Sequence, residues 1–154
     1  MEAILSAVEE ARRTMNERLG GPFGAAITDR EGNVIAVSSN RVLGDCDPTA
    51  HAEILAIREA CRKLRTHDLT GYVMHATGYP CPMCLGAMIW ANIEHCYYGA
   101  SPRDAEEIGF RDEFIYEFIR RGCEDAAVLR LEQIERERCV ELFREYHETG
   151  KVIY

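Results

Sequence analysis

Residues 72–100, which read YVMHATGYPCPMCLGAMIWANIEHCYYGA, carry the pattern that decides the fold. The runs at 72–77 and 95–100 have the length and the aromatic and β-branched content of buried strands. The segment between them, at about 82–92, has the length and apolar content of a helix that packs on a sheet. A strand, a helix and a further strand in this order form a right-handed parallel crossover. The sequence therefore predicts an α/β protein.

The rest of the chain adds helices and strands around this crossover. The expected elements, in chain order, are a helix that ends at Gly20, hairpin strands at 23–28 and 33–39, a helix at 50–64, a short helix at 103–108, a helix at 112–121, a strand at 126–131 and a helix at 134–148. A hairpin pairs its strands antiparallel, so the sheet is expected to be mixed. In the N-terminal helix, spacings of three and four residues predict one buried stripe: Ile4, Leu5, Val8, Ala11 and Met15.

At 154 residues the chain has the length of one domain, and no repeat, low-complexity tract or Pro/Ser-rich linker divides it. We therefore expect a single domain over residues 1–154. A chain of this length buries about 70% of its unfolded surface, so it needs no metal or disulfide for stability. Any metal site is therefore free to serve chemistry.

Composition and charge limit where the protein acts and what it binds. No apolar run reaches the roughly 20 residues of a membrane helix. The N-terminus lacks the basic start and apolar stretch of a signal peptide, so a cytoplasmic location is expected. Seven cysteines, an odd number, argue against a disulfide framework. The 18 Lys and Arg residues against 26 Asp and Glu disfavour a nucleic-acid partner and favour a small neutral substrate.

Three residues at two helix starts have the types and spacing of a metal site. Cys81 and Cys84 stand at i and i+3, so both sulfurs lie on one face of the first helical turn. The unpaired N–H groups and the positive dipole there favour thiolate, the form that binds metal. His51, in PTAHAEILAIREA (48–60), stands at the start of another helix. Because two such helix starts can meet at one end of a sheet, the three residues predict a Cys₂His site.

Three protein ligands are typical of a catalytic zinc site, because the fourth position stays open to water. Zinc lowers the pKa of that water to about 7. Glu53, two residues after His51, can reach the water and carry its proton, which is a general acid/base role. The pattern H-x-E followed by P-C-x-x-C is typical of zinc-dependent base deaminases.

Four segments resemble the cytidine/deoxycytidylate deaminase superfamily and, within it, the bacterial guanine deaminases. They are GGPFGAAI (20–27), DPTAHAE (47–53), PCPMCLGA (80–87) and GFRDEFIY (109–116), in the family's order along nearly the whole chain. The first three also resemble other branches, including the tRNA adenosine deaminases, whereas the fourth and a C-terminal Tyr are more particular to guanine deaminases. The resemblance implies a three-layer α/β/α fold with a five-stranded sheet.

The resemblance also implies an assembly and a set of residue roles. It implies a homodimer whose C-terminal segments, about 101–154, can be exchanged so that each helps to build the other's pocket. It implies one zinc ion per chain on His51, Cys81 and Cys84, with proton shuttling by Glu53. The substrate contacts that it implies are Asn40, the aromatic walls Phe23 and Trp90, Asp112 at the amino group of the substrate, and Tyr154 closing the pocket.

One residue departs from the family pattern. Tyr79 stands before Pro-Cys, where these relatives usually carry Glu. No ligand is changed, but a phenol replaces a charge beside the metal helix and near the substrate. A different amino-heterocycle therefore stays open as the substrate.

The expected activity is hydrolytic deamination of a free aminopurine nucleobase, with guanine going to xanthine and ammonia. Alternatives within the same chemistry are a nucleoside, an aminopyrimidine or triazine, and, least favoured by the acidic composition, adenosine in tRNA. A non-enzymatic alternative is a closed Cys₃His site that includes Cys46, which would make the chain a zinc-stapled binding module. Asp112 could equally be a helix N-cap, and Phe23 and Trp90 could be core residues.

Overall fold

The computed structural model describes residues 2–150 and 152–154, and it divides the chain into two compact units. The first unit ends at Glu113 and the second begins at Phe114. All strands of the described residues belong to the first unit. Across the described part of the chain, no helix combines the length and the apolar character needed to cross a membrane.

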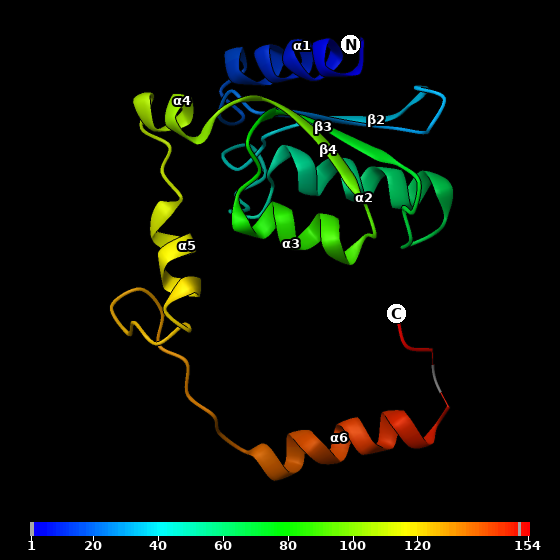
Figure 1. Cartoon of the computed structure of the whole chain (residues 1–154), viewed down its shortest axis with the longest axis vertical. Helices are drawn as coiled ribbons and strands as arrows, with labels where there is room; N and C mark the ends of the chain where they lie inside the picture. The colour runs from blue at the N-terminus through cyan, green and yellow to red at the C-terminus, as the bar shows by residue number, and fades with distance from the viewer. Residues whose placement is uncertain (1, 151) are drawn as a thin grey trace. The chain divides into compact units, whose positions relative to one another are not determined.

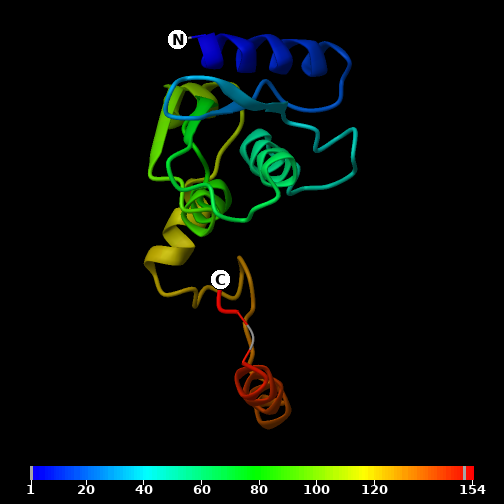
Figure 2. The same cartoon turned by 90° about the vertical axis from the view of Figure 1, so that its right-hand side faces the viewer.

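The first unit is a sheet with helices on both faces (Figures 1 and 2). Its elements, in chain order, are α1 (Glu2–Asn16), β1 (Gly24–Thr28), β2 (Val34–Ser39), α2 (Ala52–Leu64), β3 (Val73–Gly78), α3 (Pro82–Trp90), β4 (His95–Ala100) and α4 (Pro102–Glu107). Helix α1 covers one face of the sheet, and α2 and α3 cover the other. This three-layer α/β/α arrangement confirms the predicted fold class.

The sheet has the strand order β2-β1-β3-β4 and is mixed, as predicted. Strand β1 pairs antiparallel with β2 and β3, whereas β3 pairs parallel with β4. Helix α3 joins the two parallel strands and is the crossover expected between them. Because β3 ends at Gly78, its carboxyl end leads within three residues to Cys81.

The prediction of a fifth strand at residues 126–131 is wrong. The sheet has four strands, and this segment is not one of them. The backbone oxygen of Asp125 accepts hydrogen bonds from the N–H groups of Val128 and Leu129 at 3.0 and 3.1 Å. Its carboxylate accepts another from the N–H of Ala127 at 3.0 Å. The turn thus uses the donors that a strand would offer to a neighbour. An apolar run becomes a strand only where a partner edge is available.

The face that α1 buries also differs from the predicted stripe. Leu5 and Met15, both expected inside, are 58% and 41% exposed. The buried residues are smaller: Ala3, Ala7, Ala11 and Thr14. Small side chains are required because α1 lies close to β1, where a Cβ atom at Gly24 would overlap the backbone of Ala7. The prediction of a helix was correct, but the helix buries a different face from the predicted one, because only small side chains fit against β1.

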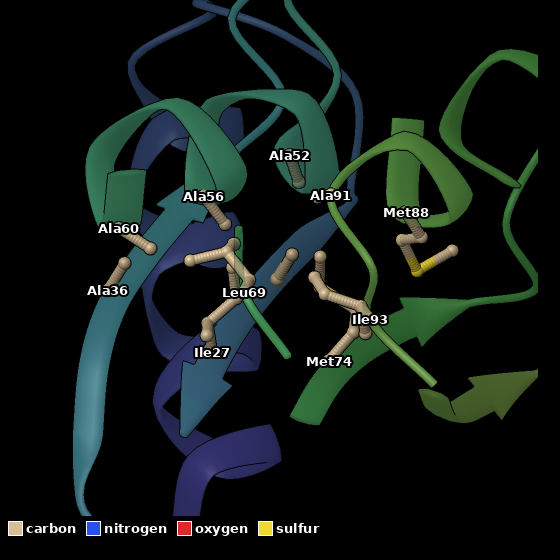
Figure 3. Packing of buried hydrophobic residues seen from close by; sticks show 11 residues of the cluster. Ile27, Ala36, Ala52, Ala56, Ala60, Leu69, Met74, Met88, Ala91 and Ile93 are labelled. Atoms are coloured by element: carbon tan, nitrogen blue, oxygen red, sulfur yellow. The ribbon is translucent and has the colours of Figure 1, made fainter. Parts of the chain in front are cut away.

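The main core lies between the sheet and helices α2 and α3 (Figure 3). Helix α2 contributes Ala52, Ala56 and Ala60, one small residue per turn, and all three are fully buried. Larger side chains fill the remaining space from the sheet and its flanking segments: Ile27, Leu69, Met74, Met88 and Ile93. The alanine face lets α2 lie close to the sheet, and close packing at this density leaves little freedom of movement. The start of α2 is therefore held firmly.

The second unit contains most of α5 (Glu113–Arg120) and all of α6 (Arg136–Glu148). Of the described residues from Phe114 onward, Phe118 alone is buried. Large apolar side chains of both helices are exposed: Phe114, Ile119, Leu142 and Phe143. This unit therefore has almost no hydrophobic core of its own.

Candidate metal and active site

The first unit brings the starts of α2 and α3 together. His51 immediately precedes α2 and Cys81 immediately precedes α3, each with an extended backbone. Neither side chain makes a capping hydrogen bond to its own helix, so both are available to other groups. Cys84 lies in the first turn of α3 and is buried. Two helix N-termini thus direct three side chains to one point.

The three ligand atoms form a nearly equilateral triangle. Cys81 Sγ lies 3.6 Å from Cys84 Sγ, and each sulfur lies 3.6 Å from His51 Nδ1. Zinc binds sulfur at about 2.3 Å and imidazole nitrogen at about 2.0–2.1 Å in tetrahedral geometry. Those bond lengths separate two sulfurs by about 3.8 Å, and a sulfur from a nitrogen by about 3.6 Å. The triangle therefore has the dimensions of three corners of a tetrahedral zinc site.

The two thiols are electrostatically unlike. The pKa of Cys81 is lowered, mainly because of its side-chain hydrogen bond with Cys84 and also because His51 lies beside it. The pKa of Cys84 is raised by that same hydrogen bond and by burial. The pair thus accepts one negative charge readily and resists a second. A divalent cation is the kind of group that stabilises both thiolates together, so the donor chemistry fits a metal ion.

Glu53 lies in the first turn of α2, two residues after His51, and is 8% exposed. Burial raises the pKa of its carboxyl group, and the charge of Cys81 acts in the same direction. A hydrogen-bond interaction with Cys84 places the carboxyl group beside the triad. A buried carboxyl group with a raised pKa holds a proton more readily than an exposed one, which suits acid/base chemistry.

Asn40 follows the end of β2 and is buried. Its Oδ1 accepts hydrogen bonds from the backbone N–H groups of Gly21 and Val42, at 3.2 and 3.3 Å. Two backbone donors on the oxygen fix the orientation of the amide, so its NH₂ end is the end left for a ligand. Gly20 is part of this arrangement, because a Cβ atom there would overlap both the backbone oxygen and Oδ1 of Asn40.

Asp112 is half-buried between α4 and α5. Burial raises the pKa of its carboxyl group first, the charge of Cys81 raises it further, and His51 lowers it. Asp112 therefore lies within electrostatic reach of two residues of the triad. Phe23 packs its ring edge-to-face on Phe110, with the ring centroids 4.9 Å apart.

The other three predicted substrate residues lie at three different places in the chain. Tyr79, 40% exposed, packs edge-to-face on Tyr98 at 5.0 Å between centroids. Trp90 is the last residue of α3 and is 78% exposed, about 13 Å along the helix axis from Cys81 at 1.5 Å per residue. Tyr154 belongs to the second unit. The structure does not bring Trp90 and the triad of the same chain together, and the substrate roles of these three residues stay predictions.

Cys46, the fourth ligand of the alternative structural site, is exposed. Its thiol donates to the backbone oxygen of Leu43 at 3.8 Å. Among the described residues, the metal-ligand cluster consists of His51, Cys81 and Cys84 alone. The arrangement therefore favours a site with an open fourth position.

Sequence reasoning overlooked two residues of this region, Gly20 and Phe110. Both stand inside segments that resemble the deaminase family, GGPF and GFRD. The doubled glycine was a signal of close backbone approach. Nothing in the sequence, however, indicated that Phe110 would contact Phe23, because the two residues are far apart along the chain.

A family comparison accounts for this fold and this cluster together. Residues 1–100 match the cytidine and deoxycytidylate deaminase zinc-binding region, and the chain belongs to that family. Zinc is therefore the metal that both the family and the His–Cys–Cys cluster support.

Individual relatives differ in how much of the chain they match. Guanine deaminase of Bacillus subtilis (strain 168) is 43% identical over 122 residues, which cover 79% of this chain and 78% of that protein. The X-ray structure of guanine deaminase from Bacillus subtilis matches with a TM-score of 0.88 and 37% identity, covering 99% of this chain and 97% of that one. The tRNA-specific adenosine deaminase of Aquifex aeolicus (strain VF5) is 44% identical over 94 residues, 61% of each chain. The likeness to guanine deaminase thus extends over more of the chain.

Proposed function

We propose that this protein is a zinc-dependent aminohydrolase that converts guanine and water to xanthine and ammonia. The observation that carries the reaction class is the tetrahedral-sized triad of His51, Cys81 and Cys84 beside the buried carboxyl group of Glu53. The choice of guanine is supported by the likeness to the Bacillus subtilis enzyme over nearly the whole chain.

His51, Cys81 and Cys84 would hold one zinc ion per chain. When bound, zinc supplies a Lewis acid that lowers the pKa of a coordinated water to about 7. With three protein ligands the site would keep one position for water, and the carboxyl group of Glu53 would be available beside it. The rigid starts of α2 and α3 fix these positions before the substrate arrives.

Glu53 moves the protons. It accepts a proton from the water that attacks the amino-bearing ring carbon and delivers it to the adjacent ring nitrogen. It then takes the proton of the new hydroxyl group and gives it to the departing amino group, which leaves as ammonia. Its raised pKa suits this double role, because the group must be a base in one step and an acid in the next.

Asn40 and Asp112 offer complementary groups to a base. The fixed amide of Asn40 presents a donor, which suits the carbonyl oxygen of guanine. Asp112 presents an acceptor, which suits an amino group and a ring N–H. Phe23 and Trp90 are proposed as aromatic walls, Tyr154 as the residue that closes the pocket, and Tyr79 as a further substrate contact.

The reaction is tested by ammonia release from purified zinc-loaded protein with free bases, nucleosides, aminopyrimidines and triazines. We expect guanine to be the best substrate. Because Tyr79 replaces a charge near the metal helix, the triazines and aminopyrimidines are the second candidates. Release of ammonia from none of these compounds would reject the proposal and favour a zinc-stapled binding module.

The role of Glu53 is tested by Glu53→Gln, which keeps the size of the side chain and removes the carboxyl group that gains and loses a proton. We expect zinc content to stay at one ion per chain and kcat to fall by about 10²–10⁴-fold. Glu59→Gln, at a half-buried position of the same helix where the carboxylate pairs with Lys63, is the control and should keep the kcat of the parent. A kcat within a few-fold of the parent in Glu53→Gln would contradict the mechanism.

We also propose that the protein works as a homodimer that exchanges its C-terminal segments. Two features support this. The first unit exposes aromatic and aliphatic side chains on α3 and on the edge strand β4: Ile89, Trp90, Tyr97 and Tyr98. The second unit has one buried residue, Phe118, and needs another surface to cover its apolar side chains. Light scattering of the purified protein should give twice the mass of one chain.

A further inference from the structure

The segment between α4 and α5 carries Asp112 but belongs to no helix or strand. Gly109, with φ of +94°, ends the helical turn, and the N–H of Phe110 donates to the backbone oxygen of Ala105 at 3.0 Å. Among the described residues, no Lys or Arg side chain pairs with Asp112. Something other than an ion pair must therefore hold its carboxylate near the triad.

The aromatic ring of Phe110 supplies that attachment. It lies edge-to-face on Phe23, at an interplanar angle of 89° and 4.9 Å between centroids. A Cβ atom at Gly21 would stand 3.0 Å from the Phe110 ring and 3.2 Å from the Phe23 ring, so the two rings close over this glycine. Such edge-to-face pairs contribute about 0.5–1.5 kcal/mol beyond the burial of area.

Phe23 is held by contacts with Asn40 and with the end of the strand that precedes the metal helix. Its N–H donates to the backbone oxygen of Gly21 at 2.9 Å, and its own oxygen accepts from the N–H of Asn40 at 2.8 Å. Its ring lies against Gly78, where a Cβ atom would be 3.5 Å away, and Gly78 is three residues before Cys81. The ring of Phe23 thus connects the entrance of the metal helix to the segment that bears Asp112.

We propose that Phe110, through its ring contact with Phe23, is the positioning residue that holds the segment bearing Asp112 in place and so sets the affinity for the substrate. This inference rests on the proposed function. Phe110 is two residues from Asp112, so the two Cα atoms are at most about 7 Å apart. A loose Phe110 therefore means a loose Asp112. In this proposal Phe110 acts through Asp112 and is neither a metal ligand nor a proton carrier.

The effect should be on binding and not on proton transfer. Loss of the Phe110 ring leaves the triad and Glu53 in place, so kcat should stay within about threefold of the parent. The substrate loses a contact that it makes both before and during the reaction, and this loss raises KM. We expect Phe110→Ala to raise KM by about tenfold, whereas Phe110→Tyr, which keeps the ring, should stay within about twofold.

The test is a double-mutant cycle in the zinc-loaded enzyme with Phe110→Ala, Asp112→Ala and the pair together. If Phe110 acts through Asp112, adding Phe110→Ala to Asp112→Ala changes KM by less than about twofold. Ile108→Ala removes an exposed apolar side chain from the same segment and is the matched control. Independent effects that multiply in the double variant, or a fall in kcat at unchanged KM, would overturn the inference.

A second measurement does not depend on turnover. In the zinc-loaded protein, Phe110→Ala should speed hydrogen exchange at the backbone amides of residues 110–113, and Ile108→Ala should not. If the protein releases ammonia from no base, the proposed function fails and exchange alone decides the inference. Exchange at 110–113 that is unchanged in Phe110→Ala would then reject it.

Discussion

The unit that ends at Glu113 buries a sheet between three helices, whereas the unit that begins at Phe114 buries one side chain, Phe118. The proposed metal ligands and Glu53 all lie in the first unit, at the starts of α2 and α3, the two helices that pack on one face of the sheet. Tyr154 and the exposed apolar residues of α5 and α6 lie in the second. The proposed chemistry thus depends on a region with a packed core, whereas Tyr154, proposed to close the pocket, belongs to a region with almost no core of its own.

The sharpest test of this division is loss of a metal ligand. Cys81→Ala should abolish zinc binding and ammonia release, because two ligands do not make a site of useful affinity. The fold of the first unit should survive, since its core is formed by side chains remote from the metal. Zinc content by atomic absorption and far-UV circular dichroism measure the two effects. Cys46→Ser, at an exposed thiol, is the control and should retain zinc. Loss of helical signal in Cys81→Ala would show that zinc is a staple.

The next test compares the two units by truncation of apolar side chains. Met74→Ala, at a fully buried position of the first core, should lower the free energy of unfolding by about 2–5 kcal/mol. Leu142→Ala, on exposed α6, should change it by about 0.5 kcal/mol or less in a monomeric chain. Urea unfolding followed by circular dichroism gives both values. A large loss in Leu142→Ala that depends on protein concentration would show that α6 is buried in an assembly.

A smaller effect is expected at Gly20, which contacts a recognition residue and no ligand. Gly20→Ala introduces a Cβ atom that overlaps the backbone oxygen and Oδ1 of Asn40, so the amide must move. We expect KM to rise about 10-fold, equivalent to about 1.4 kcal/mol, with zinc content unchanged. Gly86→Ala, where the added Cβ meets no atom within 4 Å, is the matched control. Equal kinetics in the two variants would contradict the role of the turn.

The smallest expected effect concerns the pH dependence of the first unit. His75 on β3 is half-buried with its Nε2 3.0 Å from Thr28 Oγ1, and burial lowers its pKa. The unfolded chain, with a His pKa of about 6.5, therefore binds this proton more tightly than the folded chain. The free energy of unfolding should fall as the pH drops below about 6.5, and His75 should not affect it above that pH. Urea unfolding at several pH values should show a weaker fall in His75→Gln, whereas His147→Gln on α6 should match the parent.

Sequence reasoning succeeded where one local pattern was sufficient. The parallel crossover followed from residues 72–100, and His51, Cys81 and Cys84 came together because α2 follows β2 and α3 follows β3, two strands that run in the same direction and end at the same edge of the sheet. Strand 126–131 failed because its hydrophobicity resembled that of a strand, while the hydrogen bonds of Asp125 turned the chain.

The remaining differences required knowledge of three-dimensional packing. Hydrophobicity marked Leu5 as buried, but the short distance between α1 and β1 allowed only alanine-sized residues there. The contact between Phe23 and Phe110 joins distant parts of the chain, and no periodicity connects them. Size and long-range pairing are properties of the packed structure, and single-residue patterns do not contain them.

The turn at residues 20–23 touches Asn40 on one side and Phe110 on the other, without reaching the metal ligands. We therefore expect substitutions in this turn to change base preference and to leave zinc affinity unchanged. A directed-evolution library limited to these four positions should change which heterocycle is accepted while the metal stays bound. This turn is the first region to randomise in an attempt to obtain a deaminase for a new base.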